Sequence, residues 1–298
     1  MLVVVIPTRN RPNQLKSCLE AIFKNSILPD QIIIIDSSDF NHKINDLPAD
    51  NRIRYHTTHI ASAAIQRNIG IELVSVATKY LAFLDDDVII PNNYFFKLIN
   101  TLNSTGAIGV SGLAAKPKDI NPSENNGVLR NYFSRIFLNN SKKNGVILRS
   151  GVNIPVKISR TYPIMTQWLI GCSLWNYSKI QLVRFEKDFY GQSLAEDVIF
   201  SIKASQYGTL YVDTSVEICH LESKIMRPNS EEFIYMWITN RLRVIRSGKN
   251  PVLNLIPYHW ANLGKFLQIF FTERQDKKQE IKGFLRGYKS ILRFNSEN

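Results

Sequence analysis

The chain has 298 residues, 44% of them apolar, which is enough for one large globular domain or for a domain with an extension. Basic residues exceed acidic ones by 12, which favours anionic partners such as nucleotide phosphates or lipid headgroups. No window reaches the ~18–20 apolar residues that span a bilayer, and the apolar run at the N-terminus is too short for a signal peptide. We therefore expect a globular chain without a transmembrane helix.

The three cysteines, Cys18, Cys172 and Cys219, lie far apart in apolar stretches. An odd number at such spacing predicts no disulfide framework and favours a reducing compartment. We therefore expect free, buried thiols in a cytoplasmic protein.

Strand and helix patterns alternate over the first 112 residues. Continuous apolar runs predict buried strands at residues 2–6 and 32–35, and further strands are predicted at 53–56, 80–84 and 107–110. Apolar positions at helical spacing predict helices from Pro12 to about residue 23, from about 61 to 76, and over 94–102. Such alternation predicts an α/β fold with a Rossmann-like, mostly parallel sheet flanked by helices.

The later part of the chain is less regular. Residues 113–165 are rich in Asn, Lys, Ser, Gly and Pro, and we expect a long excursion from the sheet there rather than a new domain. Regular patterns resume with a helix predicted over 196–207 and a strand over 210–212. Beyond about residue 230 the pattern is helical, which predicts a C-terminal helical extension.

Polar segments follow three of the predicted strands. They read "PTRNRP" after the first strand, "DSSD" after the second and "DDD" after the fourth. Because ligands of parallel α/β sheets bind at the carboxyl ends of the strands, we expect these segments to share one rim of the sheet.

Three adjacent carboxylates, Asp85, Asp86 and Asp87, follow a strongly apolar strand. Neighbouring like charges raise one another's pKa values, so such a cluster indicates either a solvated turn or a cation site. Since the strand fixes the loop at the binding rim, we interpret it as a site for Mg²⁺ or Mn²⁺, whose further ligands would be phosphate oxygens.

Five segments in order, "VVVIPTRNRP", "IIIIDSSD", "SAAIQRNIGI", "YLAFLDDDV" and "SLAEDVIFSIKASQYG", resemble the family 2 glycosyltransferases of the GT-A fold. The resemblance covers about residues 1–225. It implies an inverting, divalent-metal-dependent transfer of a sugar from a nucleoside diphosphate sugar, with UDP favoured, to a hydroxyl. The implied acceptor is a glycan or lipid-linked glycan in surface polysaccharide synthesis.

The resemblance also implies a division of the chain by role. Residues 1–225 would form the catalytic domain, and 226–298 the helical extension. Within the domain, 1–112 would bind the nucleotide sugar, 113–165 would be a variable excursion on the acceptor side, and 166–225 would carry the acceptor site and the catalytic base.

Nucleotide-sugar contacts follow from the same motifs. The loop that passes under the nucleotide matches Pro7, Thr8 and Arg9, and Arg67 matches a basic position beside the nucleotide. Asp36 matches the acid that helps hold the base and ribose. Many relatives have a second acid directly after it, where this chain has Ser37, and Asp39 is the candidate substitute. A surface position is the alternative for Arg67.

The remaining site residues are implied at the two acidic motifs. Asp87 and Asp85 match metal ligands, His220 is a further candidate ligand, and Asp86 would face the donor ribose or sugar. In "AED", Asp197 matches the general base and Glu196 would orient it or bind the acceptor; stabilisation of a helix N-terminus is the alternative role for both acids. The last implied contacts are Gly171 and Cys172, as walls of the sugar pocket.

Eight basic residues between Lys265 and Arg293 stand among Phe, Leu and Ile. This composition is typical of an interfacial amphipathic helix and equally of a helix docked on its own domain. We favour peripheral contact with the inner face of the cytoplasmic membrane.

Three other functions compete with transfer of a sugar. A sugar-nucleotide nucleotidyltransferase would need a glycine-rich, lysine-containing loop after the first strand, and "IPTRNRP" has no glycine. A nucleic-acid-binding protein would carry a recognisable module, whereas the basic residues here are dispersed, so we expect no nucleic acid partner. A non-catalytic sugar-nucleotide binder would not need both acidic motifs.

Overall fold

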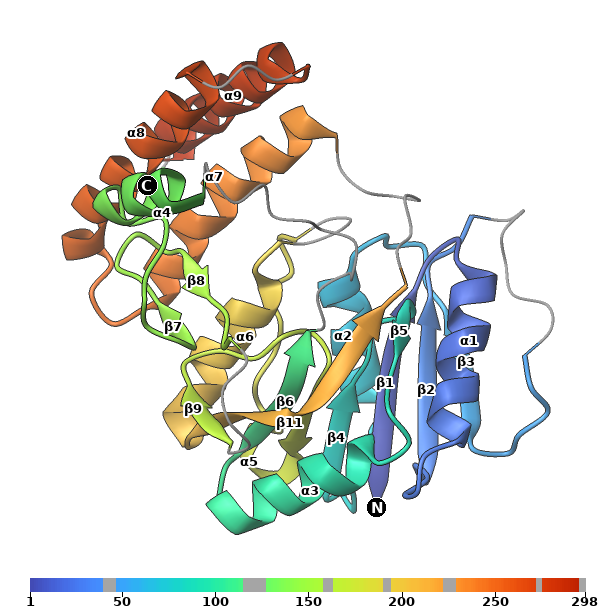
Figure 1. Ribbon diagram of the computed structural model, residues 1–298. Helices are drawn as coiled ribbons and strands as arrows, with labels where there is room; N and C mark the ends of the chain where they lie inside the picture. The colour runs from blue at the N-terminus through green and yellow to red at the C-terminus, as the bar shows by residue number, and fades with distance from the viewer. Residues whose placement is uncertain are drawn as a thin grey trace. The chain divides into compact units, whose positions relative to one another are not determined.

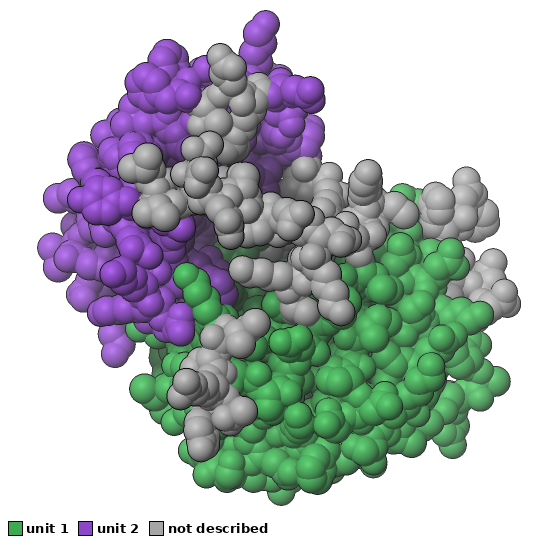
Figure 2. Space-filling view, viewed as in Figure 1, with its two compact units in different colours: residues 1–118, 156–224 green, residues 119–155, 225–298 purple. Residues whose placement is uncertain are grey.

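The computed structural model describes residues 1–39, 47–114, 127–157, 163–189, 194–221, 229–271 and 275–294, with the backbone alone for 127–130 and 293–294. The chain divides into two compact units, coloured separately in Figure 2. The first comprises Met1–Lys118 and Val156–Lys224, and the second Asp119–Pro155 and Ile225–Asn298.

The first unit is built on one mixed sheet (Figure 1). Its strands lie in the order β3-β2-β1-β4-β10-β6-β11-β5, and β9 pairs with β11. The parallel neighbours are β3 with β2, β2 with β1, β1 with β4, and β6 with β11. The bounds are β1 (Leu2–Thr8), β2 (Gln31–Asp36), β3 (Ile53–Thr57), β4 (Tyr80–Phe83), β5 (Val88–Ile89), β6 (Gly109–Ala114), β9 (Ile164–Thr166), β10 (Ser173–Asn176) and β11 (Leu210–His220).

Helices cover both faces of this sheet, as Figure 1 shows. On one face, the apolar residues of α1 (Pro12–Phe23) and α3 (Tyr94–Thr105) belong to one core cluster with alternate residues of β1, including Val4 and Ile6. On the other face lie α2 (Ala63–Glu72) and α6 (Glu196–Ala204), where the ring of Phe200 meets Phe83 at 5.7 Å. Short α5 (Tyr177–Ile180) and the 3₁₀ turn η3 (Ser205–Tyr207) complete the unit.

Close approach of α2 to the sheet depends on a glycine. A Cβ on Gly70 would lie 2.3 Å from Cγ1 of Val5 on β1. Real Cβ atoms do not approach so closely, so any larger residue would force the helix outward. This packing keeps Arg67, one turn earlier on α2, over the rim of the sheet.

The second unit is mainly helical. Its elements are α4 (Gly127–Ile136), β7 (Val146–Ile147), β8 (Asn153–Ile154), α7 (Ser230–Ser247), η4 (Val252–Asn254), α8 (Leu255–Phe271) and α9 (Lys277–Phe294). A core of Ile238, Tyr258 and Phe284 joins α7, α8 and α9. The β7–β8 connection is tied to α7, because Arg241 donates a hydrogen bond to the carbonyl of Ser150 at 2.9 Å.

The predicted fold class is confirmed: a mostly parallel sheet is flanked by helices and followed by C-terminal helices. The compact units divide the chain differently from the predicted roles, since Asp119–Pro155 groups with the C-terminal helices. The functional boundaries at 112, 165 and 225 stay a prediction. Within the described residues, none of the helices combines the length and the apolar character needed to cross a membrane.

Candidate active site

The ends of β1, β2 and β4 bring the predicted polar segments to one rim of the sheet. Thr8 at the end of β1 is in register with Asp36 at the end of β2. In the loops beyond, the backbone N–H of Asn10 donates to Ser38 Oγ at 2.7 Å. Asn10 has φ 57°, a left-handed conformation that Asn tolerates better than most residues. The expected common rim is therefore present.

The predicted nucleotide residues of the first two strands have protein partners at this rim. Pro7 is buried within β1. Asp36 is also buried and accepts hydrogen bonds from the N–H of Ser38 at 2.7 Å and from the hydroxyl of Tyr55. The exposed carboxylate of Asp39 forms an ion pair with Arg9 Nη2 at 3.3 Å. The Arg9–Asp39 pair thus lies at the surface, whereas the carboxylate of Asp36 is held inside.

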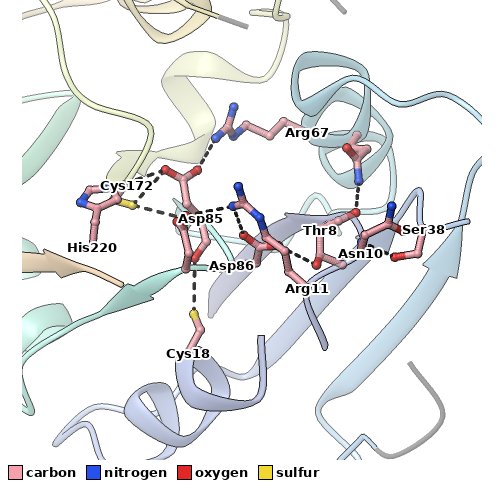
Figure 3. A network of polar contacts seen from close by, with 12 residues as sticks. Thr8, Asn10, Arg11, Cys18, Ser38, Arg67, Asp85, Asp86, Cys172 and His220 are labelled. Carbon is pink, nitrogen blue, oxygen red and sulfur yellow. Dashed lines mark hydrogen bonds and ion pairs between the residues drawn. The ribbon is translucent and has the colours of Figure 1, made fainter. Parts of the chain in front are cut away.

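Two of the three adjacent carboxylates share one arginine, Arg11, and Figure 3 shows this arginine beside Asp86. Asp86 is buried and accepts from Thr8 Oγ1 at 2.7 Å and from Arg11 Nη1 at 3.1 Å. The same Arg11 nitrogen lies 2.9 Å from Asp87 Oδ2. Burial raises the pKa of Asp86 to about 6 against the opposing effects of Thr8 and Arg11, and burial together with the charge of Asp85 raises the pKa of Asp87.

Asp85 is held by a different arginine, which also reaches the second acidic motif. Buried Arg67 donates from Nη2 to Asp85 Oδ1 at 2.5 Å and from Nη1 to Glu196 Oε1. Burial alone would raise the pKa of Asp85, but the interaction with His220 and the charge of Arg67 outweigh it and hold that pKa well below its usual range. Arg67 therefore joins two motifs that are far apart in the sequence, and the alternative of a surface arginine is wrong.

The second acidic motif opens α6. The residue before it, Ala195, has φ 73°, a conformation that costs a non-glycine residue roughly 1–2 kcal/mol and that clusters at functional sites. Glu196 is buried, while Asp197 is half-buried and accepts from the N–H of Val198 at 2.8 Å. Burial, followed by the charge of Glu196, raises the pKa of Asp197 to about 7.

A third group of side chains surrounds the other oxygen of Asp85. Cys172 Sγ lies 3.7 Å and His220 Nε2 3.9 Å from Asp85 Oδ2, and single ligand atoms of the three residues lie within 4.8 Å of one another. Gly171 packs closely against this group, since a Cβ there would lie 3.1 Å from Arg67 Nη2 and 3.3 Å from both carboxylate oxygens of Asp85. Asp87 lies outside this cluster. Of the cysteines, all free, Cys18 and Cys172 are buried as predicted, whereas Cys219 is exposed.

Three residues of the site were not predicted: Arg11, Tyr55 and Gln66. Gln66 Nε2 bridges the carbonyls of Thr8 and Ile35 at 2.8 and 2.6 Å, which ties α2 to the ends of β1 and β2. Arg11 had a signal in the sequence, because three adjacent carboxylates require counter-charge and "PTRNRP" supplies a second arginine. Nothing in the local sequence pointed to Tyr55 or Gln66.

The arrangement combines two chemical capacities. Carboxylates from the "DDD" segment line a rim where an ion and phosphate oxygens can bind. A separate carboxylate with a pKa near neutrality, Asp197, can accept a proton at physiological pH. Both belong to one network because of Arg67.

The chain is similar to known proteins in sequence and in fold. The sequence profile of glycosyl transferase family 2 matches residues 3–158. The crystal structure of S. aureus TarS 1-349 in complex with UDP-GlcNAc aligns at 11% identity over 96% of this chain and 81% of that chain, with a TM-score of 0.57. TarS 1-349 alone aligns at 12% identity over 96% and 80%, and S. aureus TarS at 12% over 96% and 49%, both with a TM-score of 0.54.

At these identities the likeness to TarS shows the fold alone, and no curated protein matches the chain. The family profile, in contrast, covers more than half of the chain, including the "DDD" segment. The chain therefore belongs to glycosyl transferase family 2 and is a glycosyltransferase with a GT-A type fold.

Proposed function

We propose that the protein is an inverting glycosyltransferase that uses a divalent cation and a nucleoside diphosphate sugar, with a uridine nucleotide favoured. The acceptor is the hydroxyl of a glycan or of a lipid-linked glycan. The observation that carries this proposal is the bridge from Asp85 through Arg67 to Glu196, which links the cation-binding carboxylates with the motif that contains the candidate base.

Asp197 is the proposed general base. Its pKa of about 7 lets the carboxylate accept the proton of the acceptor hydroxyl as that oxygen forms its bond to the anomeric carbon. The bond from that carbon to the diphosphate oxygen breaks in the same displacement, so the configuration inverts. Glu196, paired with Arg67, keeps the first turn of α6 and hence Asp197 in position.

Asp87, Asp85 and His220 are the proposed ligands of Mn²⁺ or Mg²⁺. Carboxylate oxygens suit both ions, and Gly171 keeps a side chain away from Asp85, since a Cβ there would lie 3.3 Å from both of its carboxylate oxygens. When bound, the ion supplies positive charge to the diphosphate as it leaves. Arg11 lies against Asp86 and Asp87, and its guanidinium can add to that charge at the same rim.

The remaining residues are assigned to the donor. Thr8 and Asp86, joined by a hydrogen bond, form the floor of the proposed site, while Arg9, Asp36 and Asp39 lie toward the nucleotide. Gly171 and Cys172 form the wall of the sugar pocket. The UDP-GlcNAc complex of TarS 1-349, which shares this fold, supports the choice of uridine.

A thermal-shift screen of nucleoside diphosphate sugars, with and without Mn²⁺, tests the donor assignment. We expect at least one UDP-sugar to raise the melting temperature only when Mn²⁺ is present, because an ion held by Asp85 and Asp87 would supply positive charge for the diphosphate. Asp87→Ala should abolish this metal-dependent shift. If no nucleotide sugar stabilises the wild-type protein, the donor assignment is wrong.

The charge distribution supports a membrane-associated acceptor. Of the 37 basic and 25 acidic residues, 18 and 8 fall in Asp119–Pro155 and Ile225–Asn298, so the second unit carries +10 of the net +12. On α8, Ile256, Leu263 and Phe270 recur every seven residues and are exposed, with Phe271 also 77% exposed. An apolar stripe on a strongly basic unit fits an anionic lipid surface.

Flotation of the full chain with anionic and neutral liposomes tests this contact. The variant Ile256→Ser/Phe271→Ser should lose binding to anionic vesicles, since it removes two exposed apolar side chains without touching the core. Leu182→Ser, an equally exposed position in the first unit, is the control. Equal flotation of the α8 variant and wild type would contradict the membrane contact.

A further inference from the structure

Asp85, Cys172 and His220 come from three separate segments of the first unit and meet at one point. Asp85 follows β4, Cys172 precedes β10, and His220 ends β11. Asp85 Oδ2 lies 3.7 Å from Cys172 Sγ and 3.9 Å from His220 Nε2. A tetrahedral ion with ligand bonds of ~2.0–2.3 Å would hold such atoms ~3.3–3.6 Å apart. Both measured separations exceed this range by only a few tenths of an ångström.

The surroundings of the cluster suit a bound ion. The other oxygen of Asp85 is fixed by Arg67 at 2.5 Å, which orients the carboxylate as outer-shell partners of metal ligands do. Figure 3 shows Asp85 between Arg67 and the Cys172–His220 pair, and glycine at position 171 avoids a side chain that would crowd this carboxylate. His220 is 41% exposed in its side chain, so one member of the cluster is accessible from solvent.

The donor set is the discriminating feature. Mg²⁺ and Mn²⁺ prefer oxygen ligands, whereas a thiolate together with an imidazole and a carboxylate is typical of Zn²⁺ and Co²⁺. We infer that Asp85, Cys172 and His220 form a binding site for a thiophilic divalent ion of the Zn²⁺ type. On binding, the Cys172 thiol releases its proton to solvent as the sulfur–metal bond forms.

This site shares Asp85 and His220 with the cation of the proposed function, and the inference rests on that function only in this overlap. A thiophilic ion would therefore compete with Mn²⁺ for Asp85 and His220. Asp87 lies outside the cluster and would be a ligand of Mn²⁺ alone. Because binding of the ion needs neither donor nor acceptor, it can be measured independently of sugar transfer.

Cobalt titration of the full chain, after removal of metals with a chelator, is the test. We expect one equivalent of Co²⁺ to produce a thiolate-to-cobalt charge-transfer band that Zn²⁺ abolishes. Cys172→Ser should lose the band and bind Co²⁺ at least about tenfold more weakly. Cys219→Ser, an exposed thiol outside the cluster, should behave as wild type.

The inference would be overturned by the absence of a charge-transfer band in the wild-type protein, or by a band that persists in Cys172→Ser. If Cys172→Ser does not fold, His220→Ala replaces it, because this side chain is exposed and its loss leaves the sheet intact. His220→Ala should keep the band and weaken Co²⁺ binding about tenfold. Unchanged affinity in that variant would exclude His220 and refute the three-residue site.

Discussion

Glu196→Gln should move the acid limb of the pH profile of sugar transfer to lower pH. Asp197 must be ionised to accept a proton, and its pKa is raised from 3.8 to about 7, first by burial and then by the charge of Glu196. The substitution removes that negative charge while keeping the shape of the side chain. It also leaves the charge of Arg67 less neutralised, which lowers the pKa of Asp197 further.

The size of the shift follows from the same contacts. For two unit charges taken to lie on the order of 6 Å apart, as the carboxylates of adjacent residues commonly do, an effective dielectric constant of ~20 gives roughly 3 kcal/mol, or about two pH units. Arg67 already neutralises part of the Glu196 charge, and the effect of burial remains in the variant. We therefore expect the limb to move down by roughly one pH unit.

The assay is the pH dependence of kcat/KM, which reports the pKa values of the free enzyme. Glu186→Gln is the matched control. Glu186 pairs with Lys203 on α6, and this substitution removes an equal negative charge outside the site. A limb that stays in place or moves to higher pH in Glu196→Gln would refute the assignment of Asp197 as the titrating base.

Two further predictions concern stability. Asp197→Asn should stabilise the fold at pH 8 by on the order of 1–3 kcal/mol, because a carboxyl with a raised pKa destabilises the native state once it is ionised. Near pH 4 the variant and the wild type should unfold alike. Urea titrations at both pH values measure the difference, and a variant less stable than wild type at pH 8 would contradict the raised pKa. Gly70→Ala should lower the free energy of unfolding by about 1–3 kcal/mol, since the added Cβ would overlap Val5. In the control Gly248→Ala the added Cβ would meet no atom closer than 3.4 Å, so its melting temperature should change little. A melting temperature of Gly70→Ala equal to that of wild type would contradict the packing of α2 on β1.

Much of the first unit could be predicted because its strands are continuous apolar runs. The strands at the N-terminal half were placed within a few residues, and the "DDD" segment was assigned to the correct rim. The antiparallel strand β10 was missed, because Ser173–Asn176 is a four-residue segment whose place between β4 and β6 is set by partners distant in the sequence. Short strands of this kind carry little periodicity of their own.

The candidate site shows the same limit. Motif residues such as Asp85 and Asp197 could be found from the sequence, but their electrostatic partners could not. Arg67 contacts Glu196 although the two residues are 129 positions apart in the sequence. Cys172 approaches Asp85 because β10 lies beside β4. Grouping of Asp119–Pro155 with the C-terminal helices likewise depends on long-range contacts such as Arg241 with Ser150.

The role of Asp197 as the general base is tested by single-turnover transfer with Asp197→Asn, measured at a donor concentration shown to saturate the variant. Asn keeps the size of the side chain and cannot accept the proton. We expect the variant to bind the donor as tightly as wild type and to transfer the sugar at a rate lower by roughly 10²–10⁴-fold. Transfer at the wild-type rate in the donor-saturated variant would contradict this role.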